Sequence, residues 1–558
     1  MGNFIYLTLM LTWVCRYFAN QSHALASANT HDQTNITLGE KPRQNLNYVL
    51  PKQDRFPSVL RCFKNMQLSQ CDILIIGGGI NGCGIARELA GRGYQVILCE
   101  KNDIASATSS WSTKLLHGGL RYLEHYKFRL VREALKERDI LMNMAPHLIH
   151  PMRFVLPYQA GMRPKWLLQM GLFIYANLGG RSELTRPTGV DLTTDAAGHA
   201  LRSDITHGFE YTDCFVDDSR LALANARAAS QRGAKIYRDS EIVQISKSPK
   251  GWVAKTSTRE IHAEMIINAG GPFVDQIMAL QQDRQPKKNI RLVRGSHLIT
   301  KRIFNHNKAY VFQNSDGWIL FALPYLDDFT LLGTTDMDHQ GSADHPQISN
   351  DEIDYICNEL GHYLATPLNR ETIIASYSGV RPLFDDGKKA LQSITRDYVL
   401  SWQDDATKNW LNVFGGKLTT YRQLAVKVAR LVNQKWPAPK VGLASSAHLP
   451  GGDIPCANFQ HFLDRVKRDF PAFPEQMITR MARAYGSEIY AILGTADRPK
   501  RLGQAFGYGL YQAEIEWLIE QEWVRTAEDI LDRRTKLGLY FDASIKTHLA
   551  NYLNLAEN

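Results

Sequence analysis

The feature that most constrains the fold is a glycine-rich turn between a strand and a helix near residue 80. The run 71–76 is apolar apart from Asp72, which is typical of a strand buried on both faces of a parallel sheet. Gly-Gly-Gly-Ile-Asn-Gly follows at 77–82, and a helix-like stretch continues to residue 90. A second apolar strand, 95–99, ends at the acidic residue Glu100. This order predicts a Rossmann-like, doubly wound α/β domain that binds a dinucleotide.

Each residue of this turn has a physical role. Gly77 permits the tight turn, Gly79 lets the backbone approach a pyrophosphate, and Gly82 allows the helix to pack on the strand. The N-terminus of the helix favours the phosphate charge. Glu100 is placed to accept hydrogen bonds from the ribose hydroxyls. Because FAD and NAD share this pattern, the turn alone leaves both cofactors open.

Two later segments predict glycine-ended strands that return to the same sheet. Residues 265–271 form an apolar run that ends in glycines and includes Gly270. Residues 413–420 repeat this arrangement with Gly415, Gly416 and Lys417. Such turns are expected where the backbone closes over a large cofactor.

Composition indicates a globular chain. The 558 residues suffice for two to four domains at roughly 150 residues each, and 44% hydrophobic with 22% charged residues excludes a disordered chain. A net charge of +9 suits a phosphorylated substrate or an anionic membrane surface better than nucleic acid. The eight cysteines show no C-x-x-C spacing, so we expect no metal site and a reducing compartment.

The N-terminal segment has no convincing folding pattern. Residues 4–15 form an apolar run of signal-peptide length, but no Lys or Arg precedes it. Residues 19–65 are polar and lack periodicity. We therefore expect 1–65 to be a disordered or untranslated extension, with folding beginning just after Met66.

A series of ordered motifs extends over about 67–540. They occupy 112–123, 144–147, 151–154, 294–297, 333–336, 378–383, 414–422, 449–453 and 522–531. Together with the glycine-rich start, they resemble the membrane-associated, FAD-dependent glycerol-3-phosphate dehydrogenases of the aerobic type. The resemblance implies an FAD-dependent oxidoreductase domain at 66–445, with a D-amino-acid-oxidase-like α+β substrate part, and a C-terminal α-helical domain at 446–558.

The resemblance also implies a reaction and partners. It implies oxidation of sn-glycerol 3-phosphate to dihydroxyacetone phosphate, with FAD passing electrons to a membrane quinone. It further implies a monotopic enzyme on the cytoplasmic face of the inner membrane, and a homodimer is compatible with it. Two other readings stay open: an oxidase that reduces oxygen, and a flavin-binding membrane protein without turnover.

The resemblance and the residue chemistry together nominate the site residues. Arg and Lys are expected to meet the dianionic substrate, and a base is expected near its C2 hydroxyl. The cofactor-binding candidates, beyond the first turn, are Ser112, Lys114, His117, Gly270, Gly415, Gly416, Lys417, Leu418 and Thr419. The substrate-binding candidates are Arg121, Tyr122, Arg381 and Arg396, and the catalytic candidates are His297, Arg381 and Lys417.

Several of these residues have structural alternatives. Arg381 could pair with Asp385 or Asp386 in a turn, and Arg396 could pair with Asp397. Lys417 could contact phosphate or the flavin, or hold a neighbouring carboxylate. His117 is a second candidate for the base, although a histidine in a cofactor loop can simply donate a hydrogen bond.

Residues 163–175 are basic at their start and apolar afterward. Lys, Trp and Tyr at the edges of the run fit an interfacial helix that dips into lipid headgroups, and an ordinary core helix under a basic surface fits equally. The run falls short of the roughly 20 residues that a spanning helix needs. Attachment to a membrane would therefore be peripheral.

Overall fold

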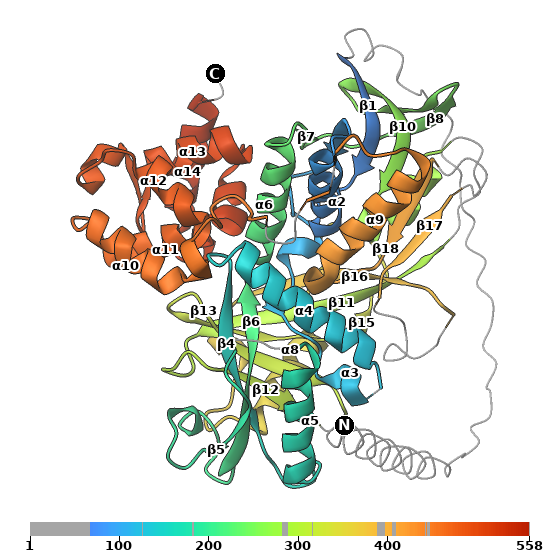
Figure 1. The fold of residues 1–558 in the computed structure, drawn as a ribbon. Coiled ribbons are helices and arrows are strands. Elements are labelled where there is room, and N and C mark those ends of the chain that lie inside the picture. Colours follow the sequence, from blue (N-terminus) through green and yellow to red (C-terminus); the bar gives the residue numbers. More distant parts are fainter. Residues whose placement is uncertain are drawn as a thin grey trace, which may run out of the picture.

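The computed structural model describes residues 67–124, 126–180, 184–281, 288–314, 316–387, 397–403, 409–440, 442–443 and 447–556. The predicted extension, 1–65, lies outside this part. The described chain contains two large sheets with the helices that pack on them, and a C-terminal group of helices with a short two-stranded sheet (Figure 1).

The first sheet contains the predicted dinucleotide-binding strands. Its order is β17-β18-β10-β1-β2-β7, and the contacts of β1 with β10 and β2, of β2 with β7 and of β10 with β18 are parallel. The strands are β1 (Gln67–Ile76), β2 (Val96–Cys99), β7 (Lys235–Tyr237), β10 (Arg259–Asn268), β17 (Val399–Trp402) and β18 (Trp410–Phe414), and β8 (Gln244–Ser248) and β9 (Gly251–Lys255) extend it beside β10. The predicted α/β fold is confirmed.

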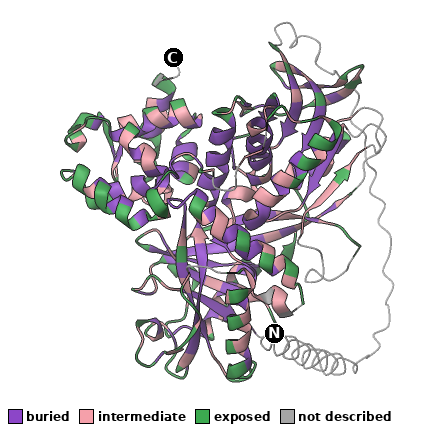
Figure 2. Ribbon diagram, viewed as in Figure 1, coloured by how far each residue is buried: buried purple, intermediate pink, exposed green. Residues whose placement is uncertain are grey.

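Three helices pack together against this sheet. Helix α2 (Ile80–Gly91) contacts both α6 (Asp218–Ser230) and α9 (Tyr421–Lys435) (Figure 1). Almost every residue of α2 and α6 is buried, so neither helix shows the polar face of a surface helix (Figure 2). This burial fixes the turn that leads into α2.

The second sheet is mainly antiparallel and lies in a different part of the molecule from the first (Figure 1). Its order is β15-β11-β14-β13-β12-β4-β6-β3, with β16 beside β11 and β5 beside β6. The strands are β3 (Leu115–Leu116), β4 (Ile149–Pro157), β5 (Thr188–Asp191), β6 (His207–Val216), β11 (Ile290–Lys301), β12 (Ala309–Gln313), β13 (Ile319–Tyr325), β14 (Phe329–Gly333), β15 (Met337–Asp338) and β16 (Ile373–Phe384). This sheet, with α4 (Phe128–Met144), α5 (Lys165–Leu178) and α8 (Asn350–Gly361), forms the expected α+β part.

The C-terminal residues form a helical group with a core of their own. It contains α10 (Phe459–Asp469), α11 (Glu475–Tyr485), α12 (Ile489–Leu493), α13 (Gln512–Glu522) and α14 (Ala543–Ala556), with a short hairpin of β19 (Ala505–Gly507) and β20 (Leu510–Tyr511). The buried residues of this core all lie between Ile454 and Leu553. The group packs beside α6 (Figure 1). Within the described ranges, no helix is long and apolar enough to cross a membrane.

Candidate active site

A cavity of about 1820 Å³ is lined by residues of both sheets. The first sheet contributes the turns that follow its strands, including Gly77, Gly270 and Gly415. The second sheet contributes residues of β11 and β16, including Gly295 and Arg381. A cavity with these walls brings the predicted cofactor turns and a predicted substrate residue into one space.

The first glycine turn is held by close backbone contacts. The N–H of Gly77 donates to the carbonyl of Cys99 at 2.8 Å, and the φ of Gly77 is +113°. A Cβ on Gly77 would lie 2.5 Å from the oxygen of Ala269. A Cβ on Gly82 would lie only 1.9 Å from the oxygen of Gly77. Gly79, the N-cap of α2, lines the cavity, whereas Gly82 acts one turn behind it through packing.

Glu100 lies at the end of β2, on the wall of the cavity. Its carboxylate accepts hydrogen bonds from the N–H of Gly78 at 2.6 Å and from the N–H of Asn102 at 3.0 Å. Burial raises the pKa of Glu100 above its usual value, although these two bonds oppose the shift. The side chain is thus anchored beside the glycine turn, where the sequence places a ribose acceptor.

The turn after β18 closes over the start of α2. Gly415 and Gly416 have φ values of +68° and +101°, and the amide of Asn81 donates to the Gly415 carbonyl at 3.1 Å. A Cβ on Gly416 would lie 2.8 Å from Nδ2 of Asn81. Leu418 and Thr419 continue this wall of the cavity.

The residues of this region fit a dinucleotide. The cavity exceeds the roughly 300–1,000 Å³ of an ordinary small-molecule pocket. Oδ1 of Asn81, beside the turn, is buried without a hydrogen-bond partner among the described residues. Side-chain-free glycines and the N-terminus of α2 offer space and N–H groups for a pyrophosphate. In the described part of the chain, no cluster of His, Cys, Asp or Glu could hold a metal ion.

Arg381 lies on β16, opposite Val293 of β11. Its guanidinium forms an ion pair with Asp336 and donates to Oγ1 of Thr334 at 3.1 Å. The partner is therefore Asp336, and neither Asp385 nor Asp386 takes the role that the sequence left open. Arg381, Thr334 and Asp336 all line the cavity.

Lys417, Tyr122 and His117 meet on another part of the wall. Nζ of Lys417 lies 4.0 Å from the centre of the Tyr122 ring, a distance suited to a cation–π contact. Burial and the charge of Lys417 lower the pKa of His117 to about 4. His117 is therefore a neutral imidazole at pH 7.

His297 lies just behind the wall. It is fully buried on β11, and its Nε2 is 3.0 Å from Oγ1 of Thr113, which does line the cavity. Its ring stacks on Tyr377 with centroids 4.7 Å apart. Burial, followed by the charges of Arg381 and Lys114, lowers the pKa of His297 well below its usual value. The imidazole thus reaches the cavity through Thr113.

The loop 112–114 divides its side chains between two directions. Ser112 lines the cavity, whereas Lys114 is buried away from it and Nζ of Lys114 pairs with Asp218 at 2.8 Å. The sequence nominated both residues for the cofactor; in the structure Ser112 lines the cavity, and Lys114 lies behind the wall in an ion pair with Asp218.

Two nominated arginines cannot be placed. Arg121 begins α3 (Arg121–Glu124), but its side chain lies outside the described part of the chain, as does the whole of Arg396.

Sequence reasoning missed two residues of this wall, Thr113 and Asp336, and one buried residue behind it, Asp218. Thr113 and Asp336 lie inside the motifs at 112–123 and 333–336, but a motif does not show which of its side chains contacts a histidine or an arginine far along the chain. Asp218 carries no motif signal; only its position at the start of a helix, next to another aspartate, marks it.

Comparisons with known proteins agree with this geometry. A family model described as FAD dependent oxidoreductase matches residues 72–421, and one described as the C-terminal domain of alpha-glycerophosphate oxidase matches residues 444–553. The chain is 43% identical over 476 residues to the D-erythritol 1-phosphate dehydrogenase of Brucella abortus, covering 84% of this chain and 95% of that protein. It is 40% identical over 489 residues to the aerobic glycerol-3-phosphate dehydrogenase of Escherichia coli, covering 86% and 97%.

A solved structure matches most of the chain. The glycerol-3-phosphate dehydrogenase of Bacillus halodurans in complex with FAD superposes with a TM-score of 0.67 at 26% identity. The match covers 87% of this chain and 94% of the other. The C-terminal helices are therefore included in the likeness.

Proposed function

Because the chain belongs to the family of FAD-dependent oxidoreductases, we propose that it oxidises sn-glycerol 3-phosphate to dihydroxyacetone phosphate and passes the electrons to a membrane quinone. The observation that carries this proposal is that the glycine turns, Arg381 and Lys417 all line one cavity. A dianionic phosphate next to a dinucleotide needs cationic side chains on the same wall.

FAD, when bound, supplies a two-electron acceptor for the hydride that leaves C2 of the substrate. The glycines of the turns and Glu100 would hold it, because they line the cavity with backbone and a carboxylate. Arg381 binds the phosphate, and Asp336 and Thr334 fix the direction of its guanidinium. Lys417, held over Tyr122, adds the second positive charge.

The hydroxyl proton has two routes out of the cavity. His117 lines the wall directly and is neutral at pH 7, so it can accept a proton. His297 accepts it through Thr113, whose hydroxyl lies 3.0 Å from Nε2. Thr113→Val separates the routes, because it removes the bridge to His297 and leaves His117 unchanged.

A second substrate is favoured by one comparison. The relative named as a D-erythritol 1-phosphate dehydrogenase is 43% identical to this chain, against 40% for the Escherichia coli enzyme. Both compounds are polyol phosphates, so the same cations serve either. The test is to measure kcat/KM for each compound with a soluble quinone. The proposal expects a higher kcat/KM for sn-glycerol 3-phosphate. A higher kcat/KM for D-erythritol 1-phosphate would make that compound the substrate in place of sn-glycerol 3-phosphate.

Peripheral attachment to a membrane is part of the proposal. Helix α5 packs Leu167, Leu172 and Tyr175 inward, while Trp166 and Phe173 are 49% and 56% exposed. Exposed Lys165 lies at its start, as in helices that rest in an anionic headgroup layer. Residues of α5 also line the cavity, so a quinone dissolved in the membrane has a short approach to it. We place the enzyme on the cytoplasmic face of the inner membrane as a monotopic protein.

A further inference from the structure

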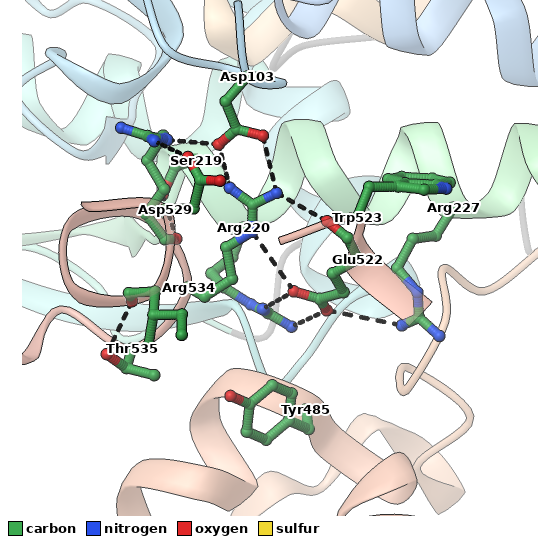
Figure 3. Close-up of polar contacts among 12 residues, drawn as sticks. Asp103, Ser219, Arg220, Arg227, Tyr485, Glu522, Trp523, Asp529, Arg534 and Thr535 are labelled. Atoms are coloured by element: carbon green, nitrogen blue, oxygen red, sulfur yellow. Dashed lines mark hydrogen bonds and ion pairs between the residues drawn. The ribbon is translucent and has the colours of Figure 1, made fainter. Parts of the chain in front are cut away.

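The C-terminal helices are joined to the rest of the molecule by buried ion pairs. Arg220 of α6 donates to both oxygens of Glu522, at 2.6 and 2.9 Å. Arg534 pairs with Asp103, which follows β2 (Figure 3). Arg220, Glu522, Asp103 and Arg534 are all at most 4% exposed. Buried charges of this kind are strongly destabilising when one partner is removed, so the interface has a defined geometry.

The same interface reaches the first turn of α6. Nζ of Lys536, from the C-terminal helical group, lies 3.4 Å from Oδ1 of Asp217 and hydrogen-bonds to Oγ of Ser219. Oγ of Ser219 also donates to the carbonyl of Arg533 at 2.9 Å. The start of α6 is therefore held by the C-terminal group on one side.

Asp218 lies between Asp217 and Ser219 in the sequence, and its side chain contacts the loop 112–114, which includes residues that line the cavity. Its carboxylate accepts from Oγ of Ser112 at 2.7 Å, from the N–H of Ser112 at 3.1 Å and from Nζ of Lys114 at 2.8 Å. Asp218 is completely buried, and Lys114 is 3% exposed. Because this carboxylate is buried, losing one of these hydrogen bonds would leave a buried charge less well satisfied, at a cost in free energy.

The loop in turn orients groups of the candidate site. The hydroxyl of Tyr377 donates to the carbonyl of Ser112 at 2.8 Å, and Thr113 contacts His297. Ser112 and Thr113 both line the cavity. A shift of the start of α6 would therefore move two residues of the wall and the bridge to His297.

We propose that Asp218 is a positioning residue for the loop 112–114, and that Lys536 makes this positioning depend on the docked C-terminal helices. This assigns those helices a part in shaping the active site, which goes beyond the proposed function. Neither Lys536 nor Asp218 lines the cavity. They act through Ser112, Lys114 and Thr113.

The test compares two charge-removing variants of C-terminal residues in the FAD-loaded, full-length enzyme. Lys536→Met removes the contact to the start of α6. Arg525→Met is the matched control, because Arg525 also pairs across the interface, with Asp239 at 2.8 Å, but is 55% exposed, and Asp239 belongs neither to α6 nor to the loop 112–114. The readouts are kcat, KM, FAD content and the visible absorption of the bound flavin.

The proposal expects kcat of Lys536→Met to fall about 10-fold, since displacements of about 1 Å cost up to 100-fold. FAD content should be unchanged and the flavin absorption shifted, while Lys536→Arg restores both readouts. Wild-type kcat and absorption in Lys536→Met would overturn the proposal. An equal loss in Arg525→Met would overturn it too, because the effect would then belong to the interface as a whole.

A double-mutant cycle tests the path through Asp218. If Lys536 acts through Asp218, then kcat of Asp218→Asn/Lys536→Met equals that of Asp218→Asn alone. Losses that multiply would contradict the path. Should Asp218→Asn not fold, Ser112→Ala takes its place in the cycle, since it removes the same hydroxyl contact.

The kinetic readouts rest on the proposed function, whereas the flavin absorption does not. A wild-type enzyme inactive with both polyol phosphates would refute the proposed function alone. In that case the absorption of Lys536→Met against Arg525→Met decides the present proposal: a shift in the first only supports it, and no shift overturns it.

Discussion

At the scale of single residues, Arg381 is the side chain that we propose binds the phosphate of the substrate. Its guanidinium is 27% exposed, lines the cavity and is held in place by Asp336 and Thr334. An arginine whose direction is fixed in this way loses little side-chain entropy when it binds a phosphate.

Arg381→Ala is expected to raise KM for the phosphate substrate about 100-fold while FAD stays bound. Hydrogen bonds to a charged group contribute about 1.5–3 kcal/mol each, and phosphate accepts more than one from a guanidinium. Steady-state kinetics and the ratio of FAD to protein measure this. Arg370→Ala is the control, since Arg370 is in an exposed ion pair with Asp354. An unchanged KM in Arg381→Ala would remove Arg381 from the substrate site.

Residue chemistry could be anticipated from the sequence better than residue partners. The cavity collects Gly77, Glu100, His117, Arg381 and Lys417, all of them nominated from motifs. The pairing of Lys114 with a residue 104 positions away was beyond sequence reasoning, because a motif shows which side chains are near in the chain and not which are near in space.

At the scale of elements, the glycine turn and α2 form one unit. Helix α2 approaches the turn so closely that Gly82 has no room for a side chain. The sequence predicted this element well, because the turn, the helix and both strands are local and follow in order.

Gly82→Ala is expected to lose most of its bound FAD. The added methyl would lie 1.9 Å from the Gly77 oxygen, so α2 and the turn must separate. Overpacking of this kind costs about 1–3 kcal/mol. The FAD content of the purified variant measures it. Gly361→Ala, where a Cβ meets nothing within 4 Å, should keep its FAD; Gly82→Ala with full FAD content would refute the account of this turn.

Helix α5 illustrates what a single apolar run leaves undecided. Its sequence fits a core helix and an interfacial helix equally. The structure shows both characters, with one side packed into the second sheet's core and large apolar side chains on the other.

Trp166→Ser/Phe173→Ser is expected to reduce binding to anionic vesicles about 10-fold or more. Each change removes exposed apolar surface that would enter the headgroup layer. Vesicle flotation measures binding, and turnover with a soluble quinone should be unaffected. Tyr508→Ser, at a side chain 58% exposed in the C-terminal group, is the control. Equal flotation of the wild type, Trp166→Ser/Phe173→Ser and Tyr508→Ser would argue against α5 as the membrane contact.

At the scale of the whole molecule, His147 lies buried where the C-terminal group meets the rest. A Cβ on Gly451 would lie 3.3 Å from its Nε2. Burial, followed by the charges of Arg220, Arg483 and Arg227, lowers the pKa of His147 to about 3. The unfolded chain takes up this proton near pH 6.5 and the folded chain does not. This difference in pKa between the unfolded and the folded chain makes the free energy of unfolding depend on pH. The contribution of neutral His147 to folded-state stability is fully present above pH 6.5 and is lost as the pH falls toward 3.

His147→Gln should therefore make the Tm less sensitive to pH. Between pH 7 and pH 5 the histidine accounts for about 2 kcal/mol of lost stability, which the glutamine variant does not lose. Calorimetry of the holoenzyme at the two pH values measures the difference. The control is His461→Gln at an exposed position of α10. If the Tm of His147→Gln falls between pH 7 and pH 5 by as much as the Tm of the wild type, then His147 is not a buried neutral imidazole in the folded chain.

The general architecture followed from the sequence, whereas the meeting of its parts did not. The parallel sheet and the helical C-terminal region had local signals in apolar runs and helical spacing. The burial of Asp103, Arg220 and Glu522 at one interface depends on contacts between distant segments, which no periodicity records.

The central claim is that the protein binds FAD and a polyol phosphate in this cavity and oxidises the polyol phosphate. The most direct measurement is anaerobic addition of sn-glycerol 3-phosphate to the purified holoenzyme while the oxidised-flavin absorption is followed. The account predicts bleaching that a soluble quinone reverses rapidly and air reverses slowly. Rapid reversal by air with release of peroxide would make the protein an oxidase, and a flavin that neither sn-glycerol 3-phosphate nor D-erythritol 1-phosphate bleaches would contradict the claim.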